Sequence, residues 1–100
     1  MDKYGISERN LAQIIDIIAG FDFVEKAVIF GSRAKGTQRK YSDIDICLFG
    51  NLDSFKAEKV RAALDELNVI YEFDVLSYNN ISNEALIEHI DRVGKTIYHI

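Results

Sequence analysis

Two strand-like runs joined by a glycine-bounded loop constrain the fold of this chain more than any other feature. The apolar residues 27–30 end at Gly31 and predict a short buried strand. Residues 43–48 carry isoleucine or leucine at every second position, which is the period of a strand with two different faces. Between these runs, residues 31–40 predict a loop in which one helical turn can begin at Ser32. We therefore expect a strand, a structured loop and a second strand in this order.

Three helices and one or two further strands are expected around this centre. Apolar side chains recur with helical spacing in three segments, which gives each helix one buried face. Their N-terminal caps are expected at Ser7, at Asp53 or Ser54, and at Ser82. Residues 69–76 predict a third strand, and residues 95–100 a short fourth strand or a frayed end. This order predicts the α+β class, as a mixed two-layer domain with three to four strands and about three helices.

Length and charge narrow the functional classes. One hundred residues make a single domain, residues 1–100, and the chain has no proline and no internal repeat. The net charge of −4 argues against general nucleic-acid binding, although basic residues gather at 33–40. No apolar run reaches the roughly 18 residues that cross a bilayer, and no signal-like segment begins the chain, so we expect a cytoplasmic protein. With Cys47 as its one cysteine, the chain forms no internal disulfide.

Asp43 and Asp45 are the first candidates for a functional site. They stand two positions apart in a predicted strand, so both side chains leave the same face. Two carboxylates about 5 Å apart repel by a few kcal/mol at an effective dielectric constant near 20. A basic neighbour, a proton or a divalent cation could offset this repulsion, and hard oxygen ligands suit Mg²⁺ or Mn²⁺ rather than zinc. The alternative is that one aspartate simply faces solvent at an exposed strand edge.

Asp74 is a third candidate because it interrupts the apolar and aromatic run of the third predicted strand. If this strand pairs beside the second, Asp74 can point into the same site as Asp43 and Asp45. Three carboxylates suit a two-metal phosphoryl-transfer site, in which two bridge the metals and the third helps to hold the metal that activates the attacking oxygen. The histidines add no ligand, because they lie far apart and His89 is expected on the solvated side of the last helix.

The loop between the two strands suits a phosphate ligand. Gly31 lets the backbone approach a ligand closely, and Ser32 offers a hydroxyl and an amide N–H. Arg33 or Lys35 could screen the charge of a leaving pyrophosphate, and Gly36 permits a positive φ as the chain turns. The loop lacks the GxxxxGK[ST] pattern of the Walker loop, so a plain turn remains the alternative.

Together the loop and the acids resemble the signature of the DNA polymerase beta-like nucleotidyltransferase superfamily. That signature is Gly-Ser-x-Ala-x-Gly followed shortly by Ser-Asp-x-Asp. In this chain it is formed by Gly31, Ser32, Ala34, Gly36, Ser42, Asp43 and Asp45. The length, the element order, Asp74 and the closing Gly-Lys-x-Ile-Tyr at residues 94–98 resemble the minimal, single-domain branch of that superfamily, the MNT proteins. The resemblance covers essentially the whole chain and implies the nucleotidyltransferase fold.

The resemblance implies an enzyme that transfers a nucleoside monophosphate from a triphosphate to an acceptor hydroxyl and releases pyrophosphate, with AMP from ATP as the expected case. Gly31 and Ser32 would hold the β- and γ-phosphates. The expected nucleotide-binding set is completed by Arg33, Lys35, Gly36 and Ser42. Asp43 and Asp45 would ligate two Mg²⁺ ions, with Mn²⁺ as a substitute. Asp74 would ligate the catalytic metal and serve as, or position, the base that deprotonates the acceptor.

The minimal branch resembles antitoxins that are encoded beside a HEPN-type RNase toxin and bind it. That resemblance implies a helical HEPN-type partner whose tyrosine hydroxyl becomes adenylylated, since a chain of 100 residues has no room for its own acceptor domain. Two alternatives stay open. The chain could be a binding module that neutralises a partner by occlusion, with a vestigial site. It could also be a transferase for a small aminoglycoside-type molecule, completed by dimerisation or by another subunit.

Overall fold

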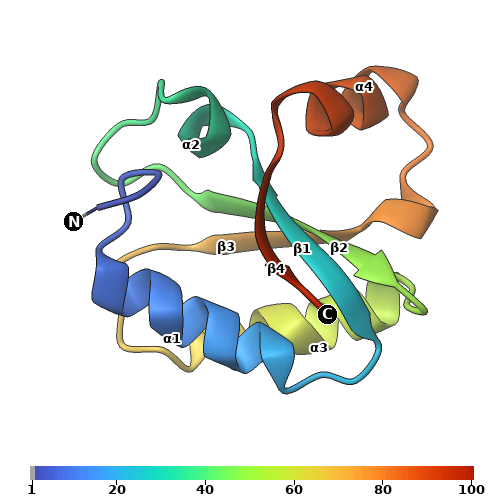
Figure 1. Cartoon of the computed structure of the whole chain (residues 1–100), viewed down its shortest axis with the longest axis horizontal. Coiled ribbons are helices and arrows are strands. Elements are labelled where there is room, and N and C mark those ends of the chain that lie inside the picture. Colours follow the sequence, from blue (N-terminus) through green and yellow to red (C-terminus); the bar gives the residue numbers. More distant parts are fainter. Residues whose placement is uncertain (1) are drawn as a thin grey trace.

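A computed structural model describes residues 2–100 of the chain, which form one mixed sheet with helices on both faces (Figure 1). In chain order, the helices and strands are α1(Glu8–Ala19), β1(Val24–Phe30), α2(Ser32–Lys35), β2(Ile44–Gly50), α3(Ser54–Asp65), β3(Phe73–Ser77), the 3-10 turn η1(Tyr78–Asn80), α4(Glu84–Val93) and β4(Lys95–His99). The strand order in the sheet is β3-β2-β1-β4. Only β2 and β3 run parallel, and β1 is antiparallel to both of its neighbours. The predicted α+β class with a mixed sheet of up to four strands is confirmed.

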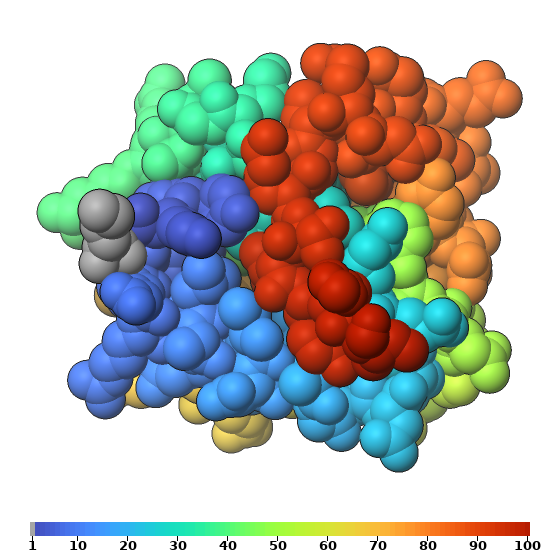
Figure 2. Space-filling view, in the orientation of Figure 1, coloured from blue at the N-terminus to red at the C-terminus, as the bar shows by residue number. Residues whose placement is uncertain are grey.

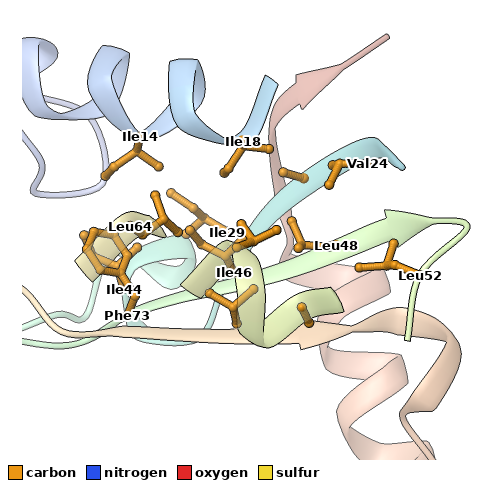
Figure 3. Packing of buried hydrophobic residues seen from close by; sticks show 14 of the residues in the cluster. Ile14, Ile18, Val24, Ile29, Ile44, Ile46, Leu48, Leu52, Leu64 and Phe73 are labelled. Atoms are coloured by element: carbon orange, nitrogen blue, oxygen red, sulfur yellow. The ribbon is translucent and has the colours of Figure 1, made fainter. Parts of the chain in front are cut away.

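The larger core lies between the sheet and helices α1 and α3 (Figure 3). Ile14 and Ile18 come from α1, Leu64 from α3, and Ile29 and Ile46 from the two central strands, and all five are completely buried. A smaller cluster on the opposite face joins the sheet to α4, so the helices cover both faces. The strand period explains this division, because alternate residues of β1 and β2 enter different clusters.

Helix starts follow local side-chain chemistry. Ser7 caps α1 by accepting from the amide of Asn10 at 3.1 Å, as predicted. Of the two candidates for α3, Asp53 is the cap, since its carboxylate accepts from the amide of Lys56 at 3.0 Å. The prediction of Ser82 for the last helix is wrong by one residue: Asn83 is the cap of α4, and its Oδ1 accepts from two amides, at 3.0 and 3.2 Å.

The third strand is shorter than predicted and begins later, at Phe73 instead of residue 69. Its partner explains the difference, because Phe73 pairs with Ile44, the first residue of β2, and the segment before it has no strand to pair with. Ile70, in that segment, is accordingly 67% exposed. Of the two expectations for the C-terminal residues, the strand is correct: β4 pairs antiparallel with β1 at the edge of the sheet. Within residues 2–100, no helix combines the length and apolar character needed to cross a membrane.

Candidate active site

The sheet brings Asp45 and Asp74 together. In the parallel register of β2 and β3, Asp45 is the partner of Asp74, and the expected pairing of the third strand beside the second is therefore found. Ile44 and Ile46, on either side of Asp45 in the strand, enter the larger core. The carboxylates of Asp45 and Asp74 therefore lie on the other face of the sheet, which α4 covers in part. Asp43 lies one residue before β2 and is exposed, as is Asp74, whereas Asp45 is partly buried.

The charges of Asp74 and Asp43 affect the protonation of Asp45. The pKa of Asp45 is raised to about 6, first by burial, then by the charges of Asp74 and Asp43, while Arg33 opposes the rise. Burial is the largest cause of this shift, and the two neighbouring carboxylates add to it. A cation bound between these acids would offset the part of the shift that comes from their charges.

Carboxylate oxygens are the ligands that Mg²⁺ and Mn²⁺ prefer, so the donor set fits a hard divalent ion. The three acids match such an ion in the type of donor atom and in charge. Across residues 2–100, no three His, Cys, Asp or Glu side chains already stand together as a group that could hold a metal. Asp45 and Asp74 are thus a juxtaposed pair with Asp43 nearby, and a metal would have to draw the three side chains closer.

The glycine-bounded loop passes directly over this acid pair. Gly31 ends β1 with φ 74° and ψ −152°, and a Cβ atom at this position would collide with Oδ2 of Asp45. Glycine is therefore required for two reasons, the positive φ and the close approach of the Asp45 carboxylate. The short helix α2 follows at once, from Ser32, and Gly36 ends it in the left-handed conformation with φ 78°. The helical turn expected after Ser32 is present.

Arg33 is placed differently from the expected phosphate ligand. It is only 2% exposed, and its guanidinium donates to the backbone carbonyls of Ser42 (2.6 Å), Asp43 (3.3 Å) and Tyr4 (2.9 Å). It also lies 4.8 Å from the ring centre of Tyr71. These contacts use the guanidinium to fix the backbone beside the acids, so its donors point away from the triphosphate role expected for it.

The remaining motif residues divide into a structural and an accessible group. The Ser42 hydroxyl accepts from the amide of Arg39 at 2.8 Å and so closes the turn that leads into β2. Lys35 ends α2 and is exposed, so it can approach an anion that Arg33 cannot reach. Ser32 is partly buried at the start of α2.

His89 is a functional candidate that sequence reasoning missed. Its Nε2 accepts a hydrogen bond from the amide of Gly31 at 3.0 Å, although 58 residues separate the two. The expectation of a solvated histidine was wrong, because position 89 belongs to the same stripe of α4 as Leu86, Ile90 and Val93, with spacing i, i+3, i+4, i+7. That spacing was the available signal. α2 and α4 lie on the same side of the sheet (Figure 1), and in that same orientation the green atoms of the loop segment adjoin the red atoms of the last helix on the surface (Figure 2).

Comparison with known proteins points to one family. Residues 12–100 match the family described as "Polymerase beta, Nucleotidyltransferase". The "Probable protein adenylyltransferase MntA" of Haemophilus influenzae is 32% identical over 57 residues, a match that spans 55% of this chain and 50% of the relative. The chain therefore aligns with half the length of this curated relative.

Solved structures share the fold at lower identity. A chain of a toxin–antitoxin structure with AMP-PNP has a TM-score of 0.64 at 23% identity, covering 95% of this chain and 75% of that one. A chain of the complex between a tri-AMPylated Shewanella oneidensis HEPN toxin and an MNT antitoxin has a TM-score of 0.63 at 21% identity, covering 93% and 72%. These likenesses establish that the same arrangement of helices and strands is shared.

Proposed function

This chain belongs to the Polymerase beta nucleotidyltransferase family, and from that premise we propose that it transfers AMP from ATP to an acceptor hydroxyl and releases pyrophosphate. The single observation that carries the proposal is the pairing of Asp45 with Asp74 beneath the Gly31 loop. Family signature and geometry thus coincide at one place on the sheet. The names of the relatives, a protein adenylyltransferase and an AMP-PNP complex, support adenine as the base.

The nucleotide would lie along the loop that joins β1 to β2. Gly31 lets the Asp45 carboxylate lie against the loop backbone where a side chain would collide with it, and Ser32 supplies a hydroxyl and an amide N–H. Lys35 is exposed and can offset the charge of the β- and γ-phosphates. Gly36 lets the chain leave α2 without strain, and Ser42 fixes the turn before the acids.

Asp43, Asp45 and Asp74 would hold magnesium, as two ions, with Mn²⁺ as a substitute. At these three acids a bound metal would supply positive charge to offset that of the phosphates and would make a coordinated hydroxyl more acidic. The charges of Asp74 and Asp43, which add to burial in raising the pKa of Asp45, support this assignment because a bound cation would offset them. Arg33 donates to the backbone carbonyls of Ser42 and Asp43, and so fixes the position of Asp43, the first of the three acids.

In the reaction the acceptor oxygen forms a bond to the α-phosphorus of ATP, while the bond between that phosphorus and the bridging oxygen of pyrophosphate breaks. The hydroxyl proton passes to the carboxylate of Asp74 or to a base that Asp74 positions. Asp74 suits this role because it is exposed on β3, the edge strand, where a large acceptor can reach it. The bond that breaks leaves its electron pair on pyrophosphate.

The acceptor that we propose is a tyrosine hydroxyl on a helical HEPN-type toxin, which makes this chain an antitoxin. The relatives support this choice, since one solved complex contains a tri-AMPylated HEPN toxin with an MNT antitoxin. The test mixes the purified chain with ATP, Mg²⁺ and the HEPN-type protein encoded beside it, and measures the mass of both proteins. The partner should gain the mass of one or more AMP groups on tyrosine.

A double variant gives the matched comparison. Asp43→Ala with Asp45→Ala should abolish AMP transfer, whereas Asp16→Ala with Asp22→Ala should not, since both of these acids are exposed and lie outside the site. A partner without added AMP would overturn the proposal. If the site variant still neutralised the toxin fully, the chain would act by occlusion instead.

A further inference from the structure

A hydrogen bond joins the Gly31 loop to the last helix. The amide N–H of Gly31 donates to Nε2 of His89 at 3.0 Å, which requires a ring that carries its proton on Nδ1. Gly31 is the point at which β1 ends and the positive-φ turn into α2 begins. The bond therefore fixes the peptide plane that precedes the turn.

The position of His89 is well determined by packing. Its neighbour Ile90 is 3% exposed and belongs to the cluster with Val28, Phe30 and Cys47. The His89 ring also meets the Phe30 ring edge to face, with centres 6.2 Å apart and planes at 81°. Since α4 is anchored on the sheet next to this ring, the imidazole can hold the loop at a fixed distance from the strands.

The chemical nature of the acceptor also fits a phosphate site. A carboxylate would accept the Gly31 amide more strongly, but its negative charge would repel a triphosphate at the same loop. A neutral imidazole accepts the bond without adding charge. The carboxylate of Asp45 also lies against Gly31, so the glycine has neighbours from both β2 and α4.

We propose that His89 is a positioning residue for the nucleotide loop: by holding the Gly31 amide it sets the affinity for the triphosphate. The inference rests on the proposed function, because it concerns the same nucleotide site. It assigns to α4 a part in nucleotide binding that the family signature, confined to residues 31–45, does not contain.

The test compares three variants by their dissociation constant for Mg²⁺-ATP. His89→Phe keeps an aromatic ring against Phe30 but removes the acceptor, and should weaken binding about tenfold, the effect of one lost hydrogen bond. His89→Gln keeps an acceptor at similar reach and should stay within about threefold of the wild type. His99→Phe, at the other histidine, is exposed on β4 and should bind like the wild type.

Hydrogen exchange of the Gly31 amide without nucleotide gives a second readout. Exchange should be faster in His89→Phe than in the wild type and in His89→Gln. Wild-type affinity in His89→Phe, or equal weakening by Phe and Gln, would overturn the positioning role while leaving the transferase intact. A wild-type protein that binds no Mg²⁺-ATP would overturn the proposed function, and the role of His89 with it.

Discussion

At the scale of single residues, Asp45 is a carboxylate whose charged form is disfavoured by its surroundings. It is partly buried, faces Asp74 across the strand pair, and lies directly under Gly31. Its pKa of about 6, against an ordinary value of 3.8, means that the folded protein holds this proton more tightly than the unfolded chain does. Stability from this group is therefore fully present below pH 3.8 and is lost as the pH rises to about 6.

Asp45→Asn should remove this pH dependence. Relative to the wild type, the metal-free variant should gain about 1–2 kcal/mol of unfolding free energy between pH 4 and pH 7, since partial exposure reduces the full effect of the pKa shift. Urea unfolding across that range measures the difference. Asp16→Asn, at an exposed position on α1, is the control. Parallel wild-type and Asp45→Asn curves would contradict the electrostatic account.

Gly31→Ala should destabilise the protein more than Gly36→Ala. Both glycines have a positive φ, but only Gly36 (φ 78°, ψ 17°) is in the left-handed helical region, where alanine costs about 1–2 kcal/mol. Gly31 (φ 74°, ψ −152°) is in a region that essentially only glycine occupies, so alanine is more strained there. Only at Gly31 would the new methyl group also strike Asp45, whereas Gly36 has open space. The difference between the two unfolding free energies combines that collision with the extra backbone strain at Gly31, and we expect about 1–3 kcal/mol or more. Equal losses would show that Asp45 does not press on the loop.

At the scale of elements, Arg33 joins segments that have no strand pairing with one another. From α2 it reaches the backbone that leads into β2 and the N-terminal segment at Tyr4, and it stacks on Tyr71 before β3. A lysine keeps the charge but lacks the planar fork that serves several carbonyls at once. Arg33 therefore acts as a clamp between the glycine loop and the acids.

Arg33→Lys should lower the unfolding free energy by about 2–3 kcal/mol, because buried carbonyls would lose their donors. Arg39→Lys, in the same loop but exposed, should change it by less than about 0.5 kcal/mol. Chemical denaturation gives both values. A tolerated lysine at position 33 would mean that water or nearby groups satisfy those carbonyls.

At the scale of the whole molecule, folding brings negatively charged side chains together at one place on the sheet. Binding of Mg²⁺-ATP there should raise the free energy of unfolding. With Mg²⁺-ATP at a hundredfold excess over its dissociation constant, linkage adds about 2.7 kcal/mol of stability. For a domain of this size that corresponds to a rise of about 10 °C or more in melting temperature. The double variant Asp45→Asn with Asp74→Asn should show no such rise in melting temperature with Mg²⁺-ATP. The wild type with ATP and a metal chelator should show only a small rise. An unchanged melting temperature would count against the site.

Sequence reasoning found the elements because they depend on neighbours along the chain. Helix caps such as Ser7 and Asp53 accept from amides three residues away. The alternation of apolar and polar residues at 43–48 indicates a strand with one buried and one different face. It misjudged the start of the third strand, which depends on where β2 begins to pair. It expected Arg33 at a phosphate and His89 in solvent, although the spacing of α4 already indicated that His89 faces inward. The hydrogen-bond partners of these two side chains cannot be read from their own segments.

The amino-acid sequence by itself determined the glycine turn, the acids at positions 43 and 45, and the apolar stripes that place helices against a sheet, because these follow from backbone geometry and local spacing. Only the tertiary structure decided that Asp74 pairs with Asp45, that Arg33 points inward to carbonyls, and that a histidine 58 residues away holds Gly31. Those contacts join segments distant in sequence, and burial with hydrogen-bond satisfaction selects them only once the whole chain is folded.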